Sequence, residues 1–335
     1  MAILVTGGAG YIGSHTTIEL LNHNYDVVIL DNLLNSNIDV LQKIEFISKK
    51  KIRFYQGDVR DPVILEKIFT SNDISDVIHF AGLKSVAESI DQPLEYYQNN
   101  VSGVLNVIEV MRNHSVFNFI FSSSATVYGE PELIPLDESC RIGGTTNPYG
   151  TSKYIAELML TDIARANPDL HITLLRYFNP VGAHSSGLIG ESPKGVPNNL
   201  VPYLTRVAAG KLECLSIFGD DYPTKDGTGV RDFIHVMDLA SGHLSAIKYR
   251  KKHNNLQVYN LGTGKGYSVL ELINAFERVT GVRVNYQFSE RRPGDIAECW
   301  SNPALAERDL NWKAVKTLDD MMSDVWRWEK NNTIK

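Results

Sequence analysis

Short apolar runs alternate with longer stretches of helical period through the first half of the chain. The runs fall at residues 2–6, 26–30, 51–55, 76–80, 117–122 and 171–177, and each has the length of a buried strand. Residues 94–112 and 149–166 repeat apolar side chains at helical spacing. Strands that alternate with helices predict an α/β fold built on a doubly wound parallel sheet.

The pattern changes after residue 178, which predicts a second part of the chain. Residues 179–199 are rich in Pro, Gly, Ser and Asn, as in a long functional loop. The remainder mixes short strands with helices, one of which should begin at Ser268, with Glu271 completing a capping box. We expect a first domain over residues 1–180 and a smaller mixed α/β domain over 181–335 that covers the substrate. The boundary is soft, because later segments can return to the first domain.

Composition narrows the class of protein. The chain has 335 residues and a net charge of -6, which argues against nucleic acid or an anionic membrane as its main partner. Cys140, Cys214 and Cys299 are far apart and form no C-x-x-C pair, as expected in a reducing compartment. There is no secretory signal and no run of membrane-spanning length, so we expect a cytoplasmic protein. The nine histidines lack metal-ligand spacing, so we predict no catalytic metal.

A glycine-rich turn follows the first expected strand. Gly7, Gly10 and Gly13 stand where a nucleotide site needs a tight turn, close approach of a pyrophosphate to backbone N–H groups, and close helix packing. Three glycines alone also fit a purely structural turn. Asp31 favours binding, because an acid about 20 residues downstream accepts from ribose hydroxyls and repels a 2′-phosphate. We therefore predict a Rossmann-like site for NAD rather than NADP.

Tyr149 and Lys153 open the helix expected over residues 149–166. Their spacing puts both on one helix face, and Ser124 ends the preceding strand beside them. A tyrosine with its ordinary pKa near 10 is a poor base, and lowering that pKa to about 7 needs roughly 4 kcal/mol. A unit positive charge at ~4 Å supplies about that much at an effective dielectric of ~20. We expect Lys153 and the oxidised nicotinamide to lower the Tyr149 pKa, so that Tyr149 takes a hydroxyl proton that Ser124 orients.

Several segments resemble the extended short-chain dehydrogenases and, among them, the UDP-glucose 4-epimerase family. The G-x-x-G-x-x-G form of the turn is the first such feature. The others are HFAGLK at 79–84, LRYFNPVG at 175–182, PNNL at 197–200, DYPT at 221–224 and RDFIHV at 231–236. The resemblance spans residues 2–328. It implies a homodimer with tightly bound NAD that oxidises C4 of a UDP-hexose, lets the 4-keto sugar turn, and returns the hydride to the other face.

The resemblance also implies the residues that line the site. Those expected at the cofactor are Gly7, Gly10, Tyr11, Ile12, Gly13, Asp31, Asn32, Asn35, Ser36, Asp58, Val59, Phe80, Ala81, Gly82, Lys84, Asn99, Ser122, Tyr149, Lys153, Tyr177 and Phe178. Those expected at the UDP-sugar are Lys84, Ser124, Thr126, Tyr149, Asn179, Asn199, Leu200, Ser216, Ile217, Phe218, Arg231, Phe233, Arg292, Asp295 and Cys299. Arg231 and Arg292 are the expected phosphate ligands, since a guanidinium fork matches phosphate oxygens.

Two residues depart from the pattern of the family at the expected sugar pocket. Cys299 stands where many relatives carry a tyrosine, and the smaller side chain leads us to expect that N-acetylated UDP-hexoses are also substrates. Phe233 replaces a frequent tyrosine, with little expected effect.

Three other functions are alternatives to UDP-hexose epimerisation. Dehydratases that resemble the chain carry Thr-Asp-Glu at the positions of residues 124–126, so the absence of those carboxylates sets dehydration aside. A 4-epimerase of another nucleotide sugar, such as UDP-glucuronate, and a non-catalytic NAD-binding module stay open. The glycine run at 262–266 lacks phosphate-loop spacing and is expected to be structural.

Overall fold

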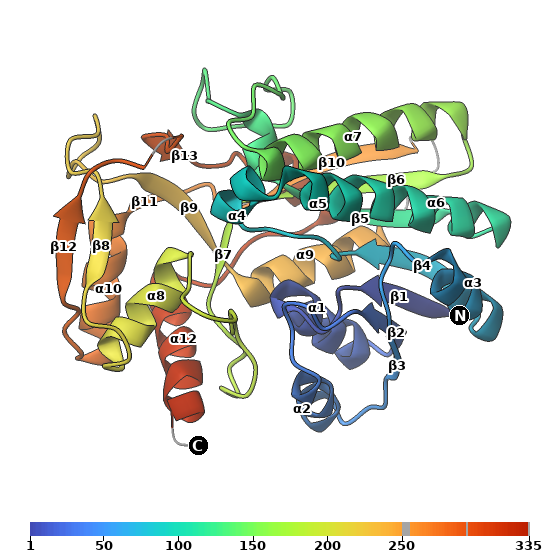
Figure 1. The fold of residues 1–335 in the computed structure, drawn as a ribbon, viewed down its shortest axis with the longest axis horizontal. Coiled ribbons are helices and arrows are strands. Elements are labelled where there is room, and N and C mark those ends of the chain that lie inside the picture. The colour runs from blue at the N-terminus through green and yellow to red at the C-terminus, as the bar shows by residue number, and fades with distance from the viewer. Residues whose placement is uncertain (250–254, 293, 334–335) are drawn as a thin grey trace.

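A parallel sheet of seven strands forms the larger part of the protein (Figure 1). The computed structural model describes residues 1–249, 255–292 and 294–333. The strands are β1 (Ala2–Thr6), β2 (Asp26–Asp31), β3 (Arg53–Gln56), β4 (Ile74–His79), β5 (Asn118–Ser124), β6 (His171–Tyr177) and β10 (Leu256–Leu261). Their spatial order is β10-β6-β5-β4-β1-β2-β3, and every neighbouring pair is parallel. The expected doubly wound sheet is confirmed.

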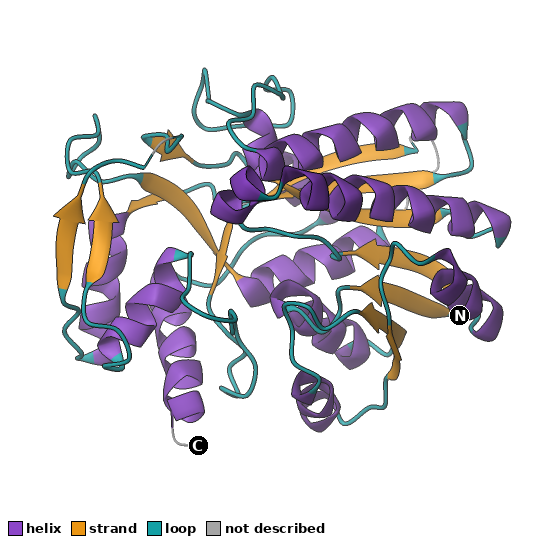
Figure 2. Cartoon of the chain, in the orientation of Figure 1, coloured by secondary structure: helices purple, strands orange, loops and turns teal. Residues whose placement is uncertain are grey.

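Helices cover both faces of this sheet, as Figure 2 shows. One face carries α3 (Pro62–Ser71), α4 (Val86–Asp91), α5 (Pro93–Tyr97), α6 (Gly103–Asn113) and α7 (Pro148–Ala166). The other face carries α1 (Tyr11–Asn22), α2 (Asp39–Ser48), α9 (Val236–Lys248) and α11 (Ala304–Leu310). Because both faces are buried, the strands read as continuous apolar runs, which is why they could be found in the sequence.

The helix expected over residues 94–112 is not continuous. The chain forms α5, then a π-helical turn over Gln98–Ser102, then α6. The wider turn brings two successive side chains, Asn99 and Asn100, into the interior. Asn100 Nδ2 donates to the Leu83 carbonyl (3.0 Å) and to Ser152 Oγ (2.9 Å), so the irregular turn connects the loop after β4 to α7.

The remaining elements form a second, mixed part of the molecule. Its larger sheet contains β7 (Asn179–Val181), β9 (Val230–His235), β11 (Gly266–Ser268) and β13 (Glu298–Cys299), and its smaller sheet pairs β8 (Leu215–Phe218) with β12 (Tyr286–Ser289). Its helices are α8 (Leu200–Ala208), α10 (Val269–Thr280) and α12 (Leu318–Thr333). Apolar side chains from these helices and from β8 and β9 form its core.

Segments late in the chain return to the first sheet. Strand β10 pairs with β6, and α9 packs against α1. The limits of the two domains stay a prediction, and we assign α9, β10 and α11 to the first of them.

The ends of α3 and α10 are capped by residues whose side chains or backbone favour those positions. Asp61 accepts from the Val63 N–H at the start of α3, and Ser268 and Glu271 form the expected capping box of α10. Gly281 follows α10 with φ +71°, in the left-handed region that favours glycine. Within the three described ranges, no helix is long and apolar enough to span a membrane.

Candidate active site

The glycine turn lies at the carboxyl end of β1, where the sheet order reverses. Gly7 has φ +70°, and a Cβ there would lie 2.7 Å from the Ala81 backbone nitrogen. A Cβ on Gly13 would lie 2.3 Å from the Gly7 carbonyl oxygen. Both positions therefore exclude larger residues, one because two loops meet there and the other because α1 packs on the turn.

This turn can hold the pyrophosphate of NAD. Gly10 caps α1 without a side-chain hydrogen bond, and the first turn of α1 contains no acidic residue. A helix N-terminus with unoccupied backbone donors attracts phosphate. Strands β1 and β4 are neighbours whose following connections run in opposite directions, which is where doubly wound sheets bind nucleotides. Of the residues expected at the cofactor, Phe80 and Ala81 lie directly against Gly7 at this edge.

Asp31 stands at the end of β2 beside the glycine turn. Its carboxylate accepts from the Ala9 N–H (3.0 Å), the Leu33 N–H (2.8 Å) and Ser36 Oγ (2.9 Å). Asn32 donates to the Asp58 carboxylate (3.0 Å), which ties the loops after β2 and β3 together. The acid expected at the ribose is therefore held in place by backbone donors, with the exposed Asn35 in the same loop.

The three expected catalytic side chains come together at the carboxyl end of β5. The Ser124 hydroxyl interacts with the Tyr149 phenol and lowers its pKa. Ser124 Oγ also accepts from Thr126 N (3.2 Å) and Thr126 Oγ1 (3.0 Å), which leaves its own hydrogen for Tyr149. Lys153 Nζ donates to the Ser122 carbonyl (2.7 Å). The N-cap Asn147, which accepts from the Gly150 N–H (2.9 Å), fixes the start of α7 and thus the position of Tyr149.

The positive charge that acts on Tyr149 in this structure comes from Lys84. Burial raises the pKa of Tyr149, while the hydrogen bond from Ser124 and the positive charge of Lys84 oppose that rise. Lys84 is thus a charge that sequence reasoning did not place at the phenol, and the expected action of Lys153 and bound nicotinamide on the Tyr149 pKa stays a prediction. Burial lowers the pKa of Lys153 itself to about 8, and the nearby Glu157 carboxylate limits the decrease.

Lys84 reaches an acid that sequence reasoning missed. Its Nζ donates to Glu191 Oε1 at 2.8 Å, and Asn199 Nδ2 donates to the same oxygen at 3.0 Å. The Glu191 side chain is 9% exposed and lies in the long loop, so one carboxylate holds two donors expected at the UDP-sugar. Nothing in the sequence pattern indicated it, because Glu191 is 107 residues from Lys84.

A second group of expected ligands gathers near β8. The Arg292 guanidinium lies 4.6 Å from the centroid of the Phe218 ring, and Arg292 Nε donates to Asp295 Oδ2 at 3.0 Å. Ser216 and Ile217 precede Phe218 on β8. On β9, Arg231 Nη1 donates to the Val230 carbonyl (2.9 Å), so this guanidinium is folded against its own strand.

The remaining expected residues are distributed between wall and core. Cys299 is buried on β13 opposite Arg231 and packs with Val127 and Phe178, and burial raises its thiol pKa to about 11. Phe233 belongs to the core of the second part, with Leu200 at its border. Three other expected residues make hydrogen bonds within the protein: Asn99 donates to the Glu95 carbonyl, Tyr11 donates to the Gly182 carbonyl, and Tyr177 is hydrogen-bonded to His243. Val59 is buried under α6, and Ile12 borders the core beneath α1. Asn179 is exposed at the start of β7.

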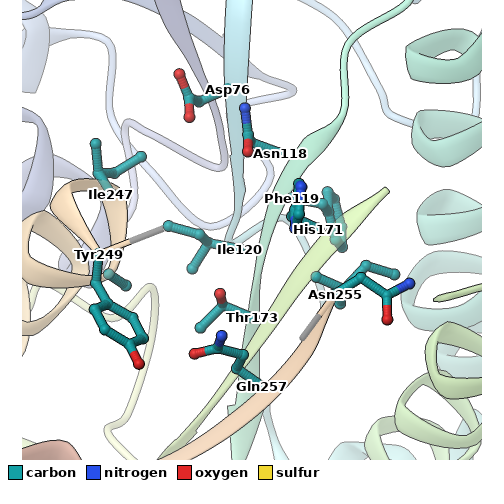
Figure 3. Close-up of a pocket in the computed structure, with 12 residues that line it drawn as sticks. Asp76, Asn118, Phe119, Ile120, His171, Thr173, Ile247, Tyr249, Asn255 and Gln257 are labelled. Atoms are coloured by element: carbon teal, nitrogen blue, oxygen red, sulfur yellow. The ribbon is translucent and has the colours of Figure 1, made fainter. Parts of the chain in front are cut away.

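A separate cavity lies at the opposite end of the sheet. Its walls include Asp76, Asn118, His171 and Gln257, near the amino ends of β4, β5, β6 and β10 (Figure 3). Its volume of about 30 Å³ has room for roughly one or two water molecules. Doubly wound sheets bind ligands at the carboxyl ends of their strands, so this cavity is not the candidate site.

The second glycine run serves the structure. The backbone N–H groups of Thr263 (2.9 Å) and Gly264 (3.1 Å) donate to the buried Asp232 carboxylate, which also accepts from Ser301 Oγ (2.5 Å). These donors are used within the protein, so they hold Asp232 and the segment after β13 rather than a phosphate.

Comparisons with known proteins agree with this geometry. A family model described as GDP-mannose 4,6 dehydratase matches residues 4–325. The chain is 60% identical to the UDP-glucose 4-epimerase of Pasteurella multocida over 332 residues, 99% of this chain and 98% of the relative. It is similar to the crystal structure of UDP-glucose 4-epimerase from Bifidobacterium longum in complex with NAD+ and UDP, with TM-score 0.96, 52% identity and 99% of each chain covered. It is also similar to the UDP-Glc/GlcNAc 4-epimerase of Campylobacter jejuni, with TM-score 0.85 and 37% identity over 98% of this chain and 99% of that one.

Proposed function

Because the chain belongs to the UDP-glucose 4-epimerases, within the extended short-chain dehydrogenase family, we propose that it interconverts UDP-glucose and UDP-galactose with NAD bound. The observation that carries the proposal is that Tyr149, Ser124 and Lys153 meet at the same sheet edge as the glycine turn, with Lys153 one turn along α7 and its Nζ on the Ser122 carbonyl. Dehydration needs a carboxylate acid/base pair, and residues 124–126 supply only hydroxyls and a methyl group.

Each residue has a distinct part in the reaction. Tyr149 takes the proton of the C4 hydroxyl, which Ser124 orients through its hydrogen bond. The NAD that the glycine turn would hold would supply the acceptor, and then the donor, of the C4 hydride. Tyr149 then returns the proton to the 4-keto sugar after the sugar has turned. The sugar can turn only if the diphosphate stays held, and Arg231 and Arg292 are the proposed anchors.

Lys84 favours a neutral hexose over a uronate. Its charge faces Tyr149 but is paired with Glu191 at 2.8 Å. A carboxylate at C6 of the sugar would need a cation that is not already neutralised. The pair therefore supports UDP-hexoses as substrates and makes UDP-glucuronate a poor one.

Replacement of Tyr149 tests the mechanism. Tyr149→Phe should lose on the order of 100-fold or more in turnover of UDP-galactose, because it removes the group that moves the proton. Tyr55→Phe is the matched control, since its phenol lies far from the site and accepts from Asn72 at 3.0 Å. NAD released on denaturation should be equal in both variants. Full turnover by Tyr149→Phe would contradict the proposed chemistry.

We also infer that N-acetylated UDP-hexoses are substrates. Cys299, on β13 opposite Arg231, carries a small thiol where a tyrosine would place a phenol ring. The relative from Campylobacter jejuni is described as acting on both kinds of sugar. Turnover of UDP-galactose and UDP-N-acetylgalactosamine, compared side by side with no NAD added, tests this inference. Cys299→Tyr should keep the first activity and lose most of the second, and equal loss of both would overturn it.

The resemblance further leads us to propose a homodimer that works in the cytoplasm. Exposed apolar side chains gather on the helices of one face, namely Val86, Ile90, Leu94, Leu105 and Leu158 on α4 to α7. A patch of this kind marks a protein interface. All three cysteines are free, as in proteins of reducing compartments.

A further inference from the structure

A buried ion pair lies beneath the catalytic helix and has no part in the reaction described above. Glu157 Oε2 accepts from Arg176 Nη2 at 2.7 Å, and Arg176 Nε also donates to Glu157. The two side chains are 2% and 4% exposed. Removing two charges from water is costly, and a well-packed apolar pair of the same size often serves stability equally well. The pair therefore calls for a reason other than stability.

The position of Glu157 on α7 relates it to the catalytic group. Tyr149, Lys153 and Glu157 are spaced by four residues, so they form one stripe along the helix. Opposite this stripe, Ser123 on β5 and Arg176 on β6 are direct cross-strand partners. Ser123 Oγ donates to Glu157 Oε1 at 2.5 Å. One carboxylate thus holds the ends of two neighbouring strands against α7.

The strand end that Glu157 holds carries the catalytic contacts. Ser122, one residue before Ser123, offers the carbonyl that accepts from Lys153 Nζ. Ser124, one residue after it, acts on the Tyr149 phenol, whose pKa it lowers. A small displacement of Ser123 therefore moves both contacts at once.

Arg176 secures the other side of Ser124. Its Nη1 donates to Tyr128 Oη at 2.9 Å, and its guanidinium lies 4.8 Å from the centroid of the Tyr128 ring. Tyr128 ends the 3-10 turn over Ala125–Tyr128, which follows Ser124 directly. The ion pair therefore fixes the backbone both before and after the catalytic serine.

We propose that Glu157 is a positioning residue of the catalytic group, which with Ser123 and Arg176 holds the end of β5 so that Ser124 and the Ser122 carbonyl meet Tyr149 and Lys153. This inference rests on the proposed function, because it takes Tyr149, Lys153 and Ser124 to be catalytic. It adds three residues that do not touch substrate and act through those that do.

Two variants test it, each with a matched control in the second part of the chain. Glu157→Gln removes the charge, and Ser123→Ala removes the hydroxyl while leaving every charge in place. Glu329 is also buried and accepts from a cation, Lys211 (2.6 Å), and a hydroxyl, Thr205 (3.5 Å). Glu329→Gln and Thr205→Ala therefore remove the same kinds of contact between α12 and residues 205–211, away from the catalytic group.

The expected result is a loss of kcat with little change in KM for UDP-galactose. A displacement of about 1 Å costs on the order of 100-fold in rate, so Glu157→Gln should lose between 10-fold and 100-fold and Ser123→Ala less. Both should retain NAD, and both controls should turn over as the wild type does. Equal kcat in Ser123→Ala and Thr205→Ala would overturn the proposal. This comparison does not depend on Glu157→Gln, so it still tests the proposal if that variant fails to fold.

The pH profile of Ser123→Ala separates positioning from a merely structural role. The groups that face Tyr149 are Ser124 on β5, Lys84 after β4, Lys153 on α7 and Tyr177 on β6. Weakening the Ser124 hydrogen bond raises the Tyr149 pKa, so the acid limb of kcat should move to higher pH. An unmoved limb would contradict positioning. Tyr149→Phe is measured alongside: if it stays active, the proposed function fails, and if it is inactive while Ser123→Ala is normal, only this inference fails.

Discussion

At the scale of single residues, Lys84 links the substrate side of the site to the base. Its charge lowers the pKa that burial raises at Tyr149, and Glu191 holds its Nζ in place at 2.8 Å. Lys153, in contrast, donates one of its three N–H groups to the Ser122 carbonyl (2.7 Å). The two lysines thus divide the work, with Lys84 acting on the phenol and Lys153 connecting α7 to β5.

Lys84→Met should therefore shift the pH dependence of turnover. Loss of the positive charge raises the Tyr149 pKa, and Tyr149 must be deprotonated to act as a base. The acid limb of kcat should move to higher pH, with several-fold lower kcat at pH 7 and recovery in more alkaline buffer. Kinetics at a series of pH values check this. Lys211→Met is the control, since its cation pairs with Glu329 at 2.6 Å, outside the site. An unchanged acid limb in Lys84→Met would show that its charge does not act on the base.

At the scale of elements, the turn between β1 and α1 has almost no room for change. Gly7 meets the loop after β4, and Gly13 brings α1 against the carbonyl of Gly7. The close packing puts the N-terminus of α1 at the switch point of the sheet, where its backbone donors face the proposed pyrophosphate site.

Alanine at Gly13 and at Gly10 should give graded effects. Both new Cβ atoms meet the same atom, the Gly7 oxygen, at 2.3 Å for Gly13 and at 3.2 Å for Gly10. Gly13→Ala must push α1 away from the turn, which we expect to cost about 1–3 kcal/mol in the free energy of unfolding and to release NAD. Gly10→Ala should lose less stability, because a few tenths of an ångström of movement suffice to fit its Cβ, even where that Cβ hinders the approach of the pyrophosphate. Chemical denaturation checks the order of the two unfolding free energies, and a reversed order would refute this account of the turn.

At the scale of the whole molecule, the outer surface of the helices on one face of the sheet exposes apolar side chains. Helices α4 to α7 lie side by side over that face in Figure 1, and their outer surface keeps apolar side chains in water, with Ile90 62% and Leu94 65% exposed. The proposed homodimer would cover them.

Leu94→Glu should weaken the homodimer. A carboxylate at the centre of an apolar interface loses water without gaining a partner, which costs several kcal/mol of association. Sedimentation at a series of concentrations should show monomer for Leu94→Glu where the wild type is dimeric. Phe46→Glu on α2 is the control, because Phe46 is as exposed (63%) but lies on the opposite face of the sheet. Identical sedimentation of Leu94→Glu and the wild type would place any interface elsewhere.

Local patterns in the sequence determined much of the fold and part of the site. The strands, the caps at Asp61 and Ser268, the glycine turn and the Tyr149–Lys153 pair depend on neighbours within a few residues or on a period along one element. The family resemblance then supplied the remaining site residues and the reaction. These features can be read from the chain because their physical causes lie within it at short range.

Contacts between distant segments were decided only by the tertiary structure. Glu191 meets Lys84 across 107 residues, Arg176 joins Glu157 beneath α7, and the π-helical turn brings Asn100 to Ser152 across 52 residues. The identity of the lysine that acts on Tyr149 was also decided by the tertiary structure. The pKa of a buried phenol depends on its burial and on its distance in space from charged groups. Spacing along the chain favoured Lys153, and the folded arrangement brought Lys84, since electrostatic interaction follows distance in space rather than distance in sequence.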